Sequence, residues 1–256
     1  MKNDLFSMDG RIALVTGASS GLGRQFARDI ATAGATVIAA ARRKSNLDQL
    51  VEEIRSDGGN AVAMEMDVTS TDSVAAVYDQ AEADIGVINV LINNAGVAAP
   101  KYFLDVNEPD WDYIMETNLK GAWRVASACS NRLVTAKKPG SIVNISSILA
   151  FATQNKQAVY GMSKAAIVHM THSMALELSR YRIRVNAIAP GYILTEINED
   201  FFASETGKAY LKTIPSRRLG EPEELTGALL LLASDAGSFI NGAVLPVDGG
   251  HLVAGR

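Results

Sequence analysis

The sequence is poor in cysteine and has no long apolar run. Its 256 residues include a single cysteine, Cys129, which excludes an internal disulfide and favours a reducing compartment. No stretch reaches the roughly 18 consecutive apolar residues of a membrane helix, and the first residues, MKNDLFSMDGR, lack the apolar core of a signal peptide. These absences predict a cytoplasmic protein with no membrane partner.

An excess of positive charge is also absent. The chain has 24 Lys and Arg residues against 28 Asp and Glu residues, a net charge of −4, so no nucleic-acid partner is expected. Of the three histidines, His169 and His172 are three residues apart, but no neighbouring cysteine or carboxylate completes a ligand set. The sequence therefore predicts no metal site.

Short apolar segments alternate with helix-like segments along the whole chain. The predicted strands are residues 12–15, 36–40, 61–66, 90–92, 141–145, 184–189 and 243–247. The predicted helices are residues 22–33, 46–56 with Asn46 as the cap, 71–85, 109–135, 159–179 and 222–233. Strands that are apolar throughout have both faces covered, and strand–helix alternation predicts parallel pairing. We expect one doubly wound α/β domain over residues 1–256, with about seven parallel strands and helices on both faces.

Glycines cluster where the first strand turns into a helix. Residues 16–23 read TGASSGLG, with glycines at 17, 21 and 23. Glycine tolerates positive φ and close approach of a ligand, and a helix N-terminus attracts a pyrophosphate. The spacing is not the usual GxGxxG, and the Lys-Ser/Thr pair of a P-loop is missing, so ATP or GTP hydrolysis is disfavoured. The turn predicts a Rossmann-type dinucleotide site.

The end of the second strand indicates which dinucleotide is bound. An acidic residue there would bind the ribose 2′-OH of NAD, but the sequence reads Arg42-Arg43-Lys44. A guanidinium matches a 2′-phosphate, so we predict NADP(H) with Arg42 on the phosphate. NAD stays open as the less favoured alternative, in which these cations form a solvated helix start.

A serine, a tyrosine and a lysine suggest proton-transfer chemistry. Ser147 follows the fifth strand, and Tyr160 and Lys164 are four residues apart, on one face of a predicted helix. A nearby ammonium lowers the pKa of a tyrosine from its usual value of about 10. Such a tyrosine can give a proton to a carbonyl oxygen or take one from an alcohol.

These motifs together resemble the short-chain dehydrogenase/reductase family. The resemblance covers nearly the whole chain and includes Asn93-Asn94-Ala95-Gly96 after the fourth strand, Asn118, Pro190-Gly191 and Asp248-Gly249-Gly250. It implies that Ser147 binds the substrate oxygen, Tyr160 is the general acid or base, and Lys164 lowers the tyrosine pKa and holds the nicotinamide ribose. It also implies that Asn118 places a water in a proton relay toward Lys164.

The motifs and the resemblance together predict two binding sets. The cofactor set is Gly17, Ser19, Ser20, Gly21, Leu22, Gly23, Arg42, Asp67, Val68, Asn94, Ala95, Gly96, Tyr160, Lys164, Pro190, Gly191, Ile193 and Thr195. The substrate set is Ser147, Leu149, Gln157 and Tyr192. Ser20 stands where many NADP-linked relatives have Arg or Lys, which argues against NADP.

The resemblance implies a carbonyl reductase or alcohol dehydrogenase, with 3-oxoacyl-thioester reduction and NAD-linked sugar or polyol oxidation as alternatives. A sugar-nucleotide epimerase or dehydratase is disfavoured by chain length and glycine spacing, and a non-catalytic nucleotide-binding regulator by the presence of Tyr160 and Lys164. Residues 191–218, which include Ile197 and Tyr210, are long enough to form a lid over a small-molecule substrate. A homotetramer is expected from the family.

Overall fold

The computed structural model describes residues 5–196 and 199–254. Its centre is a seven-stranded sheet in the order β3-β2-β1-β4-β5-β6-β7, in which every pairing is parallel. The strands are β1 Ile12–Thr16, β2 Thr36–Ala41, β3 Asn60–Glu65, β4 Val90–Asn93, β5 Gly140–Ile145, β6 Ile183–Pro190 and β7 Val244–Val247. The predicted number and direction of strands are confirmed.

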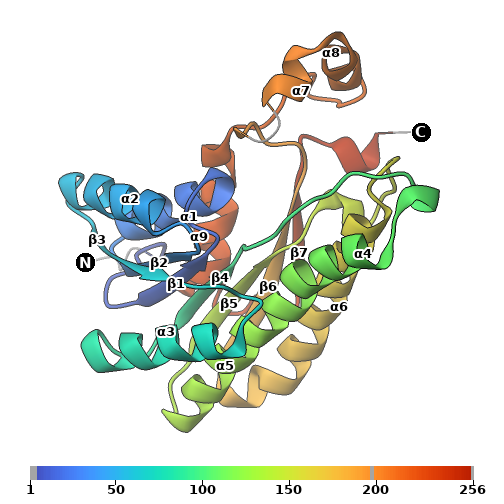
Figure 1. Ribbon diagram of the computed structural model, residues 1–256. Helices are drawn as coiled ribbons and strands as arrows, with labels where there is room; N and C mark the ends of the chain where they lie inside the picture. The colour runs from blue at the N-terminus through green and yellow to red at the C-terminus, as the bar shows by residue number, and fades with distance from the viewer. Residues whose placement is uncertain (1–4, 197–198, 255–256) are drawn as a thin grey trace.

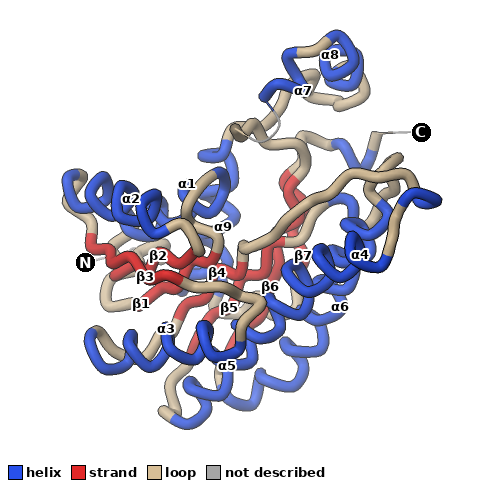
Figure 2. Tube along the Cα trace, in the orientation of Figure 1, coloured by secondary structure: helices blue, strands red, loops and turns tan. Residues whose placement is uncertain are grey.

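Helices cover both faces of the sheet (Figures 1 and 2). On one face lie α1 Gly21–Thr32, α2 Lys44–Ser56 and α9 Thr226–Ala233, which share a buried apolar cluster with the strands. On the other lie α3 Thr71–Asp84, α5 Ala122–Thr135 and α6 Ala158–Leu178, with a second cluster. The central strands β1, β4 and β5 are buried almost throughout, which is why they read as continuous apolar runs.

Two predicted helices differ from the structure. Helix α2 begins at Lys44 after the N-cap Arg43, so Asn46 is not the cap; its side chain lies in the first turn and donates to the Ser19 carbonyl. The helix predicted over residues 109–135 is divided into α4 Glu108–Met115, a π-helical segment Glu116–Gly121, and α5. A π-segment shifts the helix by one residue within an otherwise helical pattern, so hydrophobic spacing does not reveal it.

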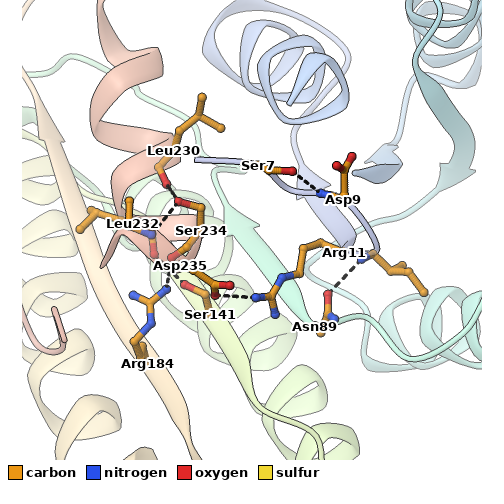
Figure 3. Close-up of polar contacts among 12 residues, drawn as sticks. Ser7, Asp9, Arg11, Asn89, Ser141, Arg184, Leu230, Leu232, Ser234 and Asp235 are labelled. Carbon is orange, nitrogen blue, oxygen red and sulfur yellow. Dashed lines mark hydrogen bonds and ion pairs between the residues drawn. The ribbon is translucent and has the colours of Figure 1, made fainter. Parts of the chain in front are cut away.

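A polar network fixes the amino-end edge of the sheet (Figure 3). The Ser141 hydroxyl donates to the Leu232 carbonyl at 2.9 Å, and the Arg184 guanidinium donates to the Ser234 carbonyl at 3.0 Å. Arg11 forms an ion pair with Asp235 at 2.6 Å. These contacts tie the end of α9 and the segment after it to β5, to β6 and to Arg11, the residue before β1. The opposite edge, where the strands end, is left to the loops that carry the predicted site.

Two short helices, α7 Glu199–Ala203 and α8 Glu205–Leu211, lie beyond the carboxyl ends of the strands and stand apart from the rest of the fold (Figure 1). They belong to the predicted lid, residues 191–218. Ile197, named in that prediction, lies outside the described residues. Across the described residues, none of the helices has both the length and the apolar character needed to cross a bilayer.

Candidate active site

Two adjoining cavities lie at the carboxyl ends of the strands. The larger has a volume of about 570 Å³ and the smaller about 290 Å³, and both are lined by Gly17, Ser20, Gly96 and Val97. Ligands of doubly wound sheets bind at this edge, in the crevice where the strand order reverses. Here the reversal falls between β1 and β4, the strands from which the shared wall extends.

The glycine turn forms one wall of the cavities. Gly17 and Gly21 have φ of +68° and +52°, which side chains other than glycine rarely adopt. A Cβ at Gly23 would lie 2.3 Å from the Gly17 carbonyl oxygen, so the turn closes only with glycine there. Ser20 makes no side-chain cap to α1, so the helix N-terminus is open to an anionic group. These features fit a dinucleotide pyrophosphate.

A hydrogen-bonded link between β1 and β4 forms the wall shared by the cavities. The Thr16 hydroxyl accepts from the backbone N–H groups of Asn94 and Ala95, both at 2.9 Å. The Asn94 side chain donates to the Thr16 carbonyl at 2.9 Å. Asn94 therefore acts here mainly to hold the segment 94–96 in place beside the glycine turn.

The smaller cavity has a basic end. Arg42 and Arg43 line it together with Ser19, Asp67 and Val68. Hydrogen bonds from Thr69 chiefly lower the pKa of the Asp67 carboxyl, and the charge of Arg42 lowers it further. The cavity thus combines cations with a carboxylate that stays ionised, which fits a phosphorylated ribose beside an adenine.

Arg43 supplies a cation that the sequence analysis did not assign to the site. Its guanidinium donates to the hydroxyls of Ser19 at 2.9 Å and Ser20 at 2.6 Å. It therefore places its positive charge on the glycine turn, at the position where Ser20 replaces the basic residue of many relatives. The run Arg42-Arg43-Lys44 in the sequence indicates that a cation is near the site. The alternation of side chains along a strand does not show which of these three residues faces the ligand.

Ser147, Tyr160 and Lys164 meet in the larger cavity. Ser147 follows β5 and is 7% exposed, and Tyr160 and Lys164 lie one turn apart on α6. The Lys164 ammonium is 5.6 Å from the centre of the Tyr160 ring and donates to the Ile145 carbonyl at 2.9 Å. The predicted cluster of serine, tyrosine and lysine side chains is therefore present as a single group.

Burial sets the protonation of this cluster. It raises the pKa of Tyr160, and a hydrogen bond with Ser147 acts in the opposite direction. It lowers the pKa of Lys164 to about 8. The Lys164 ammonium is turned toward the Ile145 carbonyl. That Lys164 lowers the tyrosine pKa stays a prediction from the family resemblance.

Asn118 lies behind the cavity wall, in the π-helical segment, and is 1% exposed. Its side-chain oxygen accepts from the Val97 N–H at 2.7 Å, and its amide donates to the Val97 carbonyl at 2.9 Å and to Ser163 at 3.2 Å. A Cβ at Gly96 would lie 3.3 Å from the Asn118 oxygen and 3.6 Å from the Lys164 ammonium. Asn118 and Lys164 are thus separated by little more than the Gly96 backbone.

Tyr192 lines the larger cavity and belongs to an aromatic cluster that extends away from it. The Tyr192 hydroxyl donates to the side-chain oxygen of Gln154. The Tyr192 ring contacts Phe202 and Tyr210 at centroid distances of 5.4 and 5.1 Å, and His251 at 5.8 Å. The lid aromatics therefore pack on one another, and the C-terminal His251, to which the sequence analysis gave no part in the site, joins them.

The comparisons with known proteins identify the family. The family model described as enoyl-(acyl carrier protein) reductase matches residues 17–251. The crystal structure of a short-chain type dehydrogenase/reductase from Mycobacterium marinum superposes with a TM-score of 0.92 at 38% identity, covering 97% of this chain and 98% of that one. The chain belongs to the short-chain dehydrogenase/reductase family.

Other members of the family are similar over their full length. The 3-oxoacyl-[acyl-carrier-protein] reductase of Thermotoga maritima is 37% identical over 246 residues, 96% of this chain and 99% of that protein. The gluconate 5-dehydrogenase of Burkholderia cenocepacia J2315, solved in complex with NADP and tartrate, superposes with a TM-score of 0.94 at 35% identity, covering 98% of this chain and 99% of that one.

In this short-chain dehydrogenase/reductase, every residue predicted to bind cofactor or substrate lines one of the two cavities, and the predicted catalytic Asn118 lies behind the wall. The sequence analysis missed several lining residues: Arg43, Thr69, Val97, Ala98, Tyr113, Ser146 and Ile148. Most lie beside predicted residues. Tyr113 comes from α4, and nothing in its helical spacing marks it. Within residues 5–196 and 199–254, no group of three His, Cys, Asp or Glu side chains could hold a metal.

Proposed function

We propose that this protein is an NADP(H)-dependent oxidoreductase that interconverts a ketone and a secondary alcohol. The observation that carries this proposal is that Ser147, Tyr160 and Lys164 face the same cavity as the glycine turn. When bound, the nicotinamide cofactor supplies or accepts the hydride. The protein then has to hold the substrate oxygen and move one proton, and its own residues are suited to both tasks.

Proton transfer is assigned to Tyr160. The Ser147 hydroxyl holds the carbonyl oxygen of the substrate, and the Tyr160 hydroxyl, which shares a hydrogen bond with Ser147, gives that oxygen a proton during reduction. In the oxidative direction Tyr160 takes the proton from the alcohol. Lys164 holds the nicotinamide ribose and restores the proton balance of Tyr160, with Asn118 placing a water behind it.

Cofactor binding is assigned along the two cavities. Residues 17–23 cradle the pyrophosphate, and Arg42 and Arg43 hold the 2′-phosphate. Asp67 and Val68 would hold adenine, residues 94–96 would hold the adjoining ribose, and Pro190, Gly191, Ile193 and Thr195 would hold the nicotinamide carboxamide. The two arginines favour NADP(H) over the alternative of an NAD-linked sugar or polyol dehydrogenase. The intact Ser147–Tyr160–Lys164 cluster favours an enzyme over a non-catalytic regulator.

Replacing the tyrosine separates catalysis from binding. We expect Tyr160→Phe to lower kcat for ketone reduction by at least a hundredfold, since general acid–base catalysis contributes roughly 10²–10⁴-fold, while the Kd for NADPH changes little. Absorbance at the reduced-nicotinamide band gives kcat, and quenching of protein fluorescence gives Kd. A variant that keeps more than a few per cent of the wild-type rate would rule out the assignment of Tyr160.

Replacing either arginine tests the choice of cofactor. We expect the wild-type enzyme to prefer NADPH in kcat/KM. Arg42→Ala and Arg43→Ala should each lower the NADPH value about tenfold to a hundredfold, the equivalent of one hydrogen bond to a charged group, and leave NADH nearly unaffected. Lys44→Ala is the matched control, because Lys44 pairs with Asp48 and does not line the cavity. Equal efficiency of the wild-type enzyme with both cofactors would contradict the proposal.

A homotetramer is part of the proposal. Several large apolar side chains are exposed on α4, α5 and α6, among them Trp123 at 54% and Leu176 at 82%. Exposed side chains of this size on neighbouring helices are suited to a subunit interface. Light scattering should give four times the chain mass of 27.2 kDa, and a monomer mass would refute the assembly. The lid role of residues 191–218 and the cytoplasmic location stay predictions.

A further inference from the structure

The cavity wall around Tyr160 carries no positive charge that could pair with a substrate anion. Away from the glycine turn, the larger cavity is bounded by Ala98, Tyr113, Ser147, Leu149, Gln157 and Tyr192, none of which is charged. Among the described residues that line this cavity, Lys164 alone carries a charge. Its ammonium is bonded to the Ile145 carbonyl and is assigned above to the cofactor. No described lining arginine or lysine is left to pair with a carboxylate.

Two lysines lie near the wall residues Ala98 and Gln157 along the chain, and both are already engaged. Lys101, three residues after Ala98, donates to both carboxylate oxygens of Asp110, at 2.7 and 2.6 Å. Lys156, the neighbour of Gln157, has its ammonium 4.7 Å from the centre of the Tyr102 ring. Neither of these lysines lines the cavity. Recruiting either one would break a contact that the structure already makes.

The chain that leaves the cavity toward the lid is acidic. Thr195 lines the cavity, and residues 196–204 then carry three carboxylates, Glu196, Glu199 and Asp200, with no cation. All three acidic residues are exposed. Charges in water act over about 8 Å at physiological ionic strength, so Glu196, next to Thr195, repels an anion approaching this side of the cavity.

Desolvation makes this arrangement selective. A carboxylate buried against an uncharged wall loses its hydration and gains no partner of opposite charge. Burying an unpaired charge in this way costs free energy. A neutral oxygen atom loses less free energy on burial than a carboxylate does, because the Gln157 amide and the Tyr113 hydroxyl can replace its hydrogen bonds to water. Leu149 adds an apolar surface beside them.

We propose that this enzyme selects small ketones and alcohols that place no charged group in the cavity, and that the uncharged Gln157 is a residue that sets this selectivity. The inference rests on the proposed function and narrows its substrate class. It distinguishes this chain from an enzyme for sugar acids or other small carboxylates.

Matched esters and acids test the proposal. The four ketones are methyl 4-acetylbenzoate, 4-acetylbenzoate, methyl 4-oxocyclohexanecarboxylate and 4-oxocyclohexanecarboxylate, each assayed with NADPH at pH 7 and low salt. Within each pair the members differ in the charge of one group, and we expect kcat/KM to be at least tenfold higher for the ester. Equal values, or a preference for the acid, would overturn charge selectivity. If none of the four ketones is reduced, the proposed function itself fails.

A pair of variants localises the effect. Gln157→Arg adds a cation to the wall, and Gln157→Met removes the amide while keeping the side-chain length and neutrality. The arginine variant should shrink the ester-to-acid ratio at least fivefold by raising kcat/KM for the acid, and the methionine variant should not. If both variants change the ratio equally, the charge of the wall does not set the selectivity at Gln157.

Discussion

The site depends on the parallel register of the four central strands. Pairing of β1 with β4, β4 with β5, and β5 with β6 brings the ends of all four to one edge, with Asn93 opposite Asn144 and Ile145 opposite Ile188. The glycine turn, the segment 94–96 and Ser147 come just after these ends, and Pro190 is the last residue of β6. A shift of one residue would turn each strand's side chains to the other face. Sheet register therefore positions cofactor and substrate groups together.

Two polar side chains, Lys164 and Asn118, are buried at the cavity to which we assign catalysis. Lys164 is 4% exposed and Asn118 is 1% exposed, yet each has backbone partners, the Ile145 carbonyl for the ammonium and both polar atoms of Val97 for the amide. Burying an ammonium is unfavourable, and this burial lowers the pKa of Lys164 in the cavity to which we assign proton transfer. The π-helical segment that carries Asn118 is a local irregularity of the same kind, placed at the site rather than in the body of the fold.

Much of the fold and site could be predicted from the sequence. The strands were predictable because both faces of the sheet are covered, and the cavity-lining residues because motifs at strand ends converge in a doubly wound sheet. Other features depend on three-dimensional partners. Arg43 reaches Ser19 and Ser20 across the turn, Lys164 faces a backbone carbonyl, and Tyr113 reaches the cavity from α4, the helix that precedes the π-segment. Spacing along one chain does not record such contacts.

The central claim is that a hydride passes directly between the cofactor and a carbon atom held at Ser147 and Tyr160. NADPH deuterated stereospecifically at C4 tests it most directly, with methyl 4-acetylbenzoate as the ketone and NMR of the alcohol product as the readout. The account predicts one deuterium on the carbinol carbon from one of the two C4 epimers and none from the other. An alcohol without deuterium from either epimer would contradict it.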